Sequence, residues 1–133
     1  MNAMLSQLLL HPRLRYAFLA CAVLMYLAIV VTGNIPGARA DIGQLASGIV
    51  LHSTAYAILA GLCFLGSTGS PAARAAKAVL AVALMGAGDE FIQSFFPYRG
   101  ASVHDWEVDC AAAILTVLLL CTVLPKSVLA TKR

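Results

Sequence analysis

Four long apolar runs, separated by short polar segments, dominate the hydrophobic pattern along the chain. The runs extend over about residues 16–32, 45–66, 75–96 and 106–124. Within each run, apolar residues occur on every face of the predicted helix instead of forming one stripe. This is typical of helices that face both lipid and one another. Clusters rich in Pro, Gly and Asn separate the runs, because these residues interrupt helices. The pattern predicts an all-α, four-helix transmembrane bundle that forms a single domain over residues 1–133.

Composition supports a membrane protein and excludes other classes. Hydrophobic residues make up 61% and charged residues 11% of the 133 residues, against about 45–50% and 25% in soluble domains. A disordered chain or a soluble domain does not fit these values. The charges form no basic stripe, so nucleic acid is not an expected partner. None of the four cysteines has zinc-ligand spacing, and we expect them to be small buried packing residues.

The distribution of cations predicts the orientation in the membrane. Seven of the 9 Lys and Arg residues fall on one side of a four-span arrangement, and only Arg39 and Arg99 fall on the other. The positive-inside rule then places both termini in the cytoplasm and the loop over residues 97–105 outside. The first run also permits a second interpretation, a signal peptide cleaved near Ala38–Arg39–Ala40. Its apolar core is, however, longer than the usual 7–15 residues or so.

Acidic residues gather at the predicted outer end of the last two runs. Asp89 and Glu90 lie six or seven residues before Phe96, which corresponds to a depth of roughly 10 Å along a helix. At that depth they must face protein or water, pair with a cation, or bind protons. Gln93 lies one turn further along, so the three side chains can share one helix face.

Further polar residues occur at a similar predicted depth. His52 and Tyr56 lie one turn apart in the second run, where a polar contact between helices is the simpler role for His52. Asp105 and Asp109 lie one turn apart at the start of the fourth run, and acids there also offset the helix dipole. Arg99 could bind a carboxylate or a phosphate in bidentate fashion.

Ser102 precedes Asp105 in an S-x-x-D pattern that predicts a capping box at the start of the fourth helix.

The segment from Gly88 to Asp105 resembles the VanZ-like family of small membrane proteins. That family carries approximately D-E-x-x-Q, then an Arg and an Asp at fixed spacing, and an H-x-x-x-Y pattern in an earlier helix. The residues that match are His52, Tyr56, Asp89, Glu90, Gln93, Arg99 and Asp105. Asp109 stands where the family usually has Asn, and the resemblance covers about residues 48–113.

The resemblance implies a four-helix protein of the bacterial cytoplasmic membrane. The founding member of the family is linked to resistance to the antibiotic teicoplanin. We therefore expect an outward-facing polar site that binds or modifies the head group of an envelope lipid or glycolipid. In that site Asp89 and Glu90 would act as acid and base, or hold a divalent cation through oxygen ligands, and His52 would relay a proton. The expected substrate-binding residues are Tyr56, Gln93, Arg99, Asp105 and Asp109.

Two other functions remain open at this point. Intramembrane acids and histidines form proton relays in many pumps, so the chain could be a proton- or cation-coupled transport element. Four short helices would then require a homo-oligomer, and the polar residues are confined to one leaflet. The chain could also be a structural subunit without catalysis, in which these residues only hold helices together.

Overall fold

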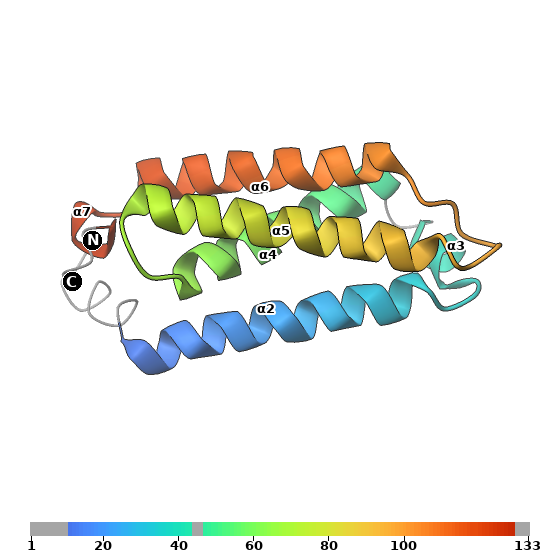
Figure 1. Cartoon of the computed structure of the whole chain (residues 1–133), viewed down its shortest axis with the longest axis horizontal. Helices are drawn as coiled ribbons and strands as arrows, with labels where there is room; N and C mark the ends of the chain where they lie inside the picture. Colours follow the sequence, from blue (N-terminus) through green and yellow to red (C-terminus); the bar gives the residue numbers. More distant parts are fainter. Residues whose placement is uncertain (1–10, 44–46, 130–133) are drawn as a thin grey trace.

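A computed structural model describes residues 11–43 and 47–129, and all regular structure within these ranges is helical, as predicted. The four long helices are α2 (Pro12–Gly33), α4 (Gly48–Gly66), α5 (Pro71–Gln93) and α6 (Val103–Val123). Two short helices, α3 (Ala38–Gly43) and α7 (Lys126–Leu129), follow α2 and α6. The long helices lie side by side and alternate in direction, so α2 begins and α6 ends at the same end of the bundle (Figure 1).

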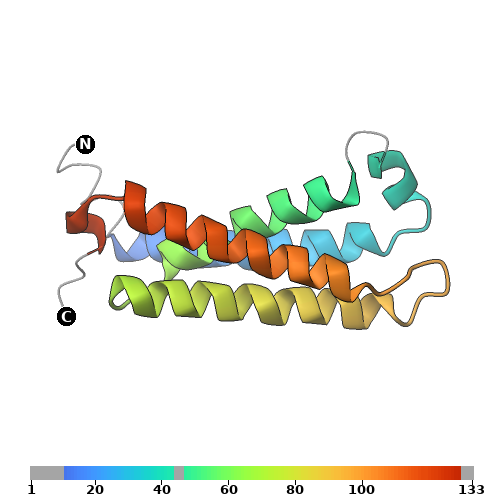
Figure 2. The ribbon, with the colours of Figure 1, turned by 90° about the horizontal axis from the view of Figure 1, so that it is seen from above.

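Helix α4 is the central element, since it packs against α2, α5 and α6. Figure 2 shows the same bundle turned by 90°, with α5 and α6 running along its length. Leu59, Ala60 and Phe64 of α4 are completely buried and form the middle of the apolar core. Cys63 is also buried there, as predicted, whereas Cys21 is exposed, so the packing prediction is wrong for Cys21.

Serine caps define where three of the long helices begin. The Oγ atoms of Ser47, Ser70 and Ser102 accept hydrogen bonds from the third backbone N–H of α4, α5 and α6, at 3.4, 3.2 and 3.2 Å. Such caps satisfy N–H groups that have no partner within the helix. Consequently α4 begins three residues later, and α5 four residues earlier, than the apolar runs indicate.

The ends of two helices also differ from the prediction. Helix α5 ends at Gln93 and not at Phe96, so Asp89 and Glu90 lie within about one turn, or 6 Å, of its end instead of about 10 Å. Helix α2 begins at Pro12, because the ring of His11 accepts a hydrogen bond from the N–H of Arg13 and caps the helix. Residues 38–43, which include the candidate cleavage site, form the short helix α3.

Three helices, α2, α4 and α6, are long and apolar enough to cross a membrane. Helix α5 has 23 residues, but it carries charged residues near both ends. Many large apolar side chains on the outside of the bundle are exposed, among them Leu24, Leu80, Leu84 and Leu118. Exposed large apolar side chains in this number are typical of a surface in contact with lipid.

Arg74 directly precedes the third apolar run (about residues 75–96), and this position predicts a loop between two helices. In the structure Arg74 instead lies inside the bundle. It belongs to the first turn of α5 and is only 2% exposed. Its Nε donates to the carbonyl of Phe64 (3.1 Å) and its Nη1 to the carbonyl of Val128 (3.0 Å). The guanidinium carbon also lies 4.5 Å from the centre of the Phe64 ring. With Arg15 and Lys77, Arg74 forms the basic end of the bundle, where all three side chains donate to backbone carbonyls.

Candidate functional site

The opposite end of the bundle, which we call the acidic end, is formed by the carboxyl ends of α2 and α5 and the amino ends of α4 and α6. All eight site residues expected from the sequence lie there or in the adjoining loop. They are His52, Tyr56, Asp89, Glu90, Gln93, Arg99, Asp105 and Asp109. Residues that are far apart in the sequence therefore meet at one end of the structure.

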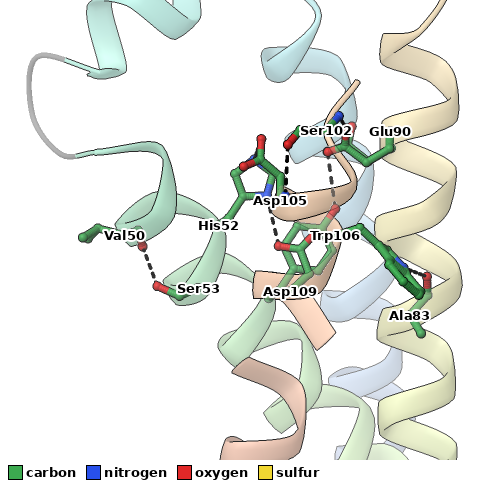
Figure 3. Close-up of polar contacts among 11 residues, drawn as sticks. Val50, His52, Ser53, Ala83, Glu90, Ser102, Asp105, Trp106 and Asp109 are labelled. Atoms are coloured by element: carbon green, nitrogen blue, oxygen red, sulfur yellow. Dashed lines mark hydrogen bonds and ion pairs between the residues drawn. The ribbon is translucent and has the colours of Figure 1, made fainter. Parts of the chain in front are cut away.

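The imidazole of His52 lies between two carboxylates of α6 (Figure 3). Its Nδ1 is 3.0 Å from Oδ1 of Asp109, and its Nε2 is 3.8 Å from Oδ2 of Asp105. Asp109 is 0% exposed. A hydrogen bond from the Nδ1–H to Asp109 leaves the lone pair on Nε2, directed to the side where Asp105 lies. The contact thus fixes the orientation of the imidazole ring.

Tyr56 connects His52 to Asp89. The rings of Tyr56 and His52 are parallel, with centroids 5.9 Å apart. The hydroxyl of Tyr56 donates to Oδ2 of Asp89 over a long distance of 3.4 Å. Asp89 is 2% exposed, and its other oxygen, Oδ1, is buried without a hydrogen-bond partner among the described residues. A buried carboxylate oxygen without a donor is costly, which is typical of a place where a ligand, ion or water binds.

Glu90 takes over one half of the predicted capping box. The Ser102 side chain caps α6 as expected, by accepting from the N–H of Asp105. In a capping box the carboxylate at the position of Asp105 would accept from the N–H of Ser102. Here that N–H donates to Oε2 of Glu90, at 2.6 Å. The side chain of Asp105 therefore lies toward His52, and Glu90 links α5 to the start of α6.

Gln93 and Arg99 line a chamber at the acidic end, together with His52, Tyr56 and Asp89. The chamber has a volume of about 190 Å³. Its remaining wall is formed by residues of α2 and α4: Ile29, Thr32, Gly33, Gly48, Leu51 and Ala55. The chamber therefore has one polar side and one mainly apolar side.

A second hollow, of about 350 Å³, lies on the other side of the cluster and is lined by Glu90, Ser102 and Trp106. The indole N–H of Trp106 donates to the carbonyl of Ala83 (2.9 Å), which holds α6 against α5. Gly86 permits this close approach, because a Cβ there would lie 3.0 Å from Oδ2 of Asp109. The polar cluster is thus reached from two hollows, with His52 on one side and Glu90 on the other.

The acidic end holds more carboxylates than cations. Asp89, Glu90 and Asp109 are at least nine-tenths buried, and the side chain of Asp105 is 14% exposed. The imidazole of His52 is the basic group that contacts two of them. Buried carboxylates are costly unless they are paired, protonated or bound to metal. The arrangement can therefore bind a cationic group or an ion, or exchange protons.

Comparison with known proteins adds no identification. No protein-family model, curated protein or solved structure matches the chain. The resemblance to the VanZ-like family thus depends on the quoted motif alone. The functional argument depends on the geometry of the residues described above.

Several parts of the site could not be found from the sequence. Thr32 and Gly33 of α2 line the chamber, but α2 is apolar on all sides and carries no stripe that would reveal its buried face. The backbone N–H of Ser102 carries no sequence signal as a partner of Glu90. His104 and Glu107, in contrast, pair with each other at 3.6 Å and are 68% and 64% exposed, so they lie outside the cluster.

Proposed function

We propose that this chain is a multi-pass, VanZ-like protein of the bacterial cytoplasmic membrane that binds the head group of an envelope lipid or glycolipid at its acidic end. The observation that carries the proposal is the chamber with one polar and one mainly apolar side, in which Asp89 has a buried oxygen without a hydrogen-bond donor. The charge bias of the sequence predicts that this end lies on the outer side of the membrane.

The arrangement of α5 supports a fourth membrane crossing. Arg74, Asp89 and Glu90 all face the interior of the bundle, whereas Leu80 and Leu84 are more than 60% exposed. In a bilayer, intramembrane charges are expected to face the protein interior, with apolar side chains toward lipid. With its charged side chains toward the bundle and its leucines outward, α5 meets this requirement for a membrane crossing.

The polar and apolar sides of the chamber match the polar head group and the hydrocarbon chain of a lipid. Its volume of about 190 Å³ suits a small head group and not a whole lipid. Asp89 can accept hydrogen bonds from hydroxyl or ammonium groups, and Arg99 can bind a phosphate. Arg99 reaches α2, since a Cβ on Gly33 would lie 3.9 Å from its Nη2. The apolar wall can contact the first carbons of the acyl or isoprenyl chain.

The same residues offer acid–base chemistry. Asp109 orients His52, whose ring is stacked on Tyr56, and the hydroxyl of Tyr56 donates to Asp89. Groups that can donate or accept protons are therefore close to one another. Such groups could modify a bound head group by proton transfer. The residues Leu59, Ala60 and Phe64 of α4 follow directly below Tyr56, and they are completely buried. An apolar layer at this position favours a binding site over a transport pathway.

The test is to identify the lipids that remain bound to the purified protein. We expect mass spectrometry to detect one lipid class that is enriched over the bulk membrane, and Asp89→Asn and Arg99→Gln to lower its occupancy about tenfold. Glu107→Gln is the matched control, because it removes an exposed acid of the same end. Equal lipid content in all four proteins would overturn the proposal.

A further inference from the structure

The residues His52, Glu90 and Asp105 bring three ligating groups together from three different helices, α4, α5 and α6. One nitrogen or carboxylate oxygen from each of them lies within 4.8 Å of the others. We infer that these three residues bind a divalent first-row transition metal ion. The inference rests on the proposed function for the outward orientation of the site, and it names what that site holds besides a head group.

The separations are close to those of a metal site. Bonds of about 2.0–2.1 Å to a tetrahedral ion place two ligand atoms about 3.4 Å apart. His52 Nε2 and Asp105 Oδ2 are 3.8 Å apart. These two atoms therefore need to move only a few tenths of an ångström, and Glu90 needs a modest inward shift. Three protein ligands leave a fourth position open, as in zinc sites that carry out chemistry.

Hydrogen bonds already orient two of the three ligands. His52 contacts the buried Asp109 through Nδ1 (3.0 Å), which leaves Nε2 for the ion. Metal-binding histidines usually donate their second nitrogen to a carboxylate in this way. Glu90 accepts from the N–H of Ser102 through Oε2 (2.6 Å). Its Oε1 is buried without a hydrogen-bond partner among the described residues, in a side chain that is 9% exposed.

Charge explains why an ion is favoured at this place. Glu90 and Asp105 supply two negative charges next to a third, Asp109, in a largely buried cluster. A divalent cation neutralises two of them and gives Glu90 a partner besides the N–H of Ser102. One imidazole with two carboxylates suits Zn²⁺ or Mn²⁺, whereas Ca²⁺ and Mg²⁺ prefer oxygen ligands alone.

The experiment uses the full chain in detergent, stripped with a chelator and dialysed against Zn²⁺, Mn²⁺ or Ca²⁺. We expect one Zn²⁺ per chain, binding at least tenfold more tightly than Ca²⁺. Glu90→Gln and Asp105→Asn should each weaken Zn²⁺ binding about 100-fold, judged from the 10- to 100-fold cost of losing an outer-shell partner alone. The variants His104→Ala and Glu107→Gln, which remove the exposed pair of the same residue types, should bind as the wild type does.

A second measurement uses the wild-type protein alone and so does not depend on whether the variants fold. Co²⁺ added to the stripped wild-type protein should give visible absorption stronger than that of Co²⁺ in buffer, because four-coordinate Co²⁺ absorbs more strongly than the six-coordinate aqua ion. Wild-type protein that binds less than 0.2 equivalents of Zn²⁺, or folded Glu90→Gln protein that binds Zn²⁺ like the wild type, would overturn the inference. If the wild-type protein binds Zn²⁺ but purifies without an enriched lipid class, the result contradicts the proposed function and leaves the metal site in place.

Discussion

His52 and Asp109 lie on neighbouring helices, 57 positions apart in the chain, and their side chains meet at 3.0 Å within the bundle. Asp109 is fully buried, so its carboxylate depends on this contact. Removing one partner of a buried pair leaves the other uncompensated, whereas removing both relieves the cost. Mutations of this pair therefore test whether specific pairing of His52 with Asp109 stabilises the acidic end.

We expect His52→Ala to destabilise the protein by about 3 kcal/mol, and the double variant with Asp109→Asn to recover part of that loss. A double-mutant cycle on unfolding in mixed detergent should give a coupling energy of about 1–3 kcal/mol. The exposed pair His104 and Glu107 is the matched control, with a coupling below about 1 kcal/mol. Equal coupling in the two pairs would show that the buried contact has no special role.

The close approach of α5 and α6 should depend on Gly86. A Cβ at this position would lie 3.0 Å from Asp109 Oδ2 and 3.2 Å from Trp106 Cδ1, whereas one at Gly61 would meet only Thr116, at 3.9 Å. Ala favours a helix over Gly by about 1 kcal/mol. We expect Gly61→Ala to stabilise the protein, and Gly86→Ala to destabilise it by about 1 kcal/mol through overpacking. Thermal unfolding in detergent distinguishes the two, and a similar gain for both would contradict the packing.

Arg74 should not be replaceable by lysine. Its guanidinium donates to the carbonyls of Phe64 and Val128 from one planar group and lies over the Phe64 ring, which a single ammonium cannot reproduce. We expect Arg74→Lys to lower the free energy of unfolding by about 1.5–3 kcal/mol. Lys77→Arg, at an exposed position on the same helix, should change it little. Wild-type stability of Arg74→Lys would disprove the bridging role.

The predicted orientation can be tested with single cysteines in a chain whose own four cysteines are replaced by alanine. Gly100 is suitable, because a Cβ there has nothing within 4 Å. A membrane-impermeant thiol reagent should label Gly100→Cys in intact cells, since the positive-inside rule places this loop outside. Ala72→Cys, exposed near the basic end, should react only after the cells are opened. The reverse pattern would invert the topology.

The sequence was sufficient to predict the helical class and the position of the polar residues, because both follow from local patterns. Four apolar runs became four long helices, and the cap at Ser102 follows from the S-x-x-D pattern. The helix boundaries shifted where a cap, such as Ser70, extended a helix into polar sequence. The orientation in the membrane and the function stay predictions.

Contacts between helices were beyond reach of the sequence, because they depend on how the helices rotate against one another. Arg74 was expected in a loop, but it fills the basic end of the bundle through carbonyls of α4 and α7. The pairing of His52 with Asp109, and the wall that α2 adds to the chamber, likewise have no local signal. Periodicity cannot place a helix that is apolar all round.

The hydrogen bond from the Ser102 N–H to Glu90 has a consequence for biogenesis. The first turn of α6 is completed by a side chain of α5, so neither segment satisfies its polar groups alone in lipid. The two segments are separated by only nine residues, from 94 to 102. We therefore expect α5 and α6 to enter the membrane together as a helical hairpin, in which Glu90 already accepts from the N–H of Ser102.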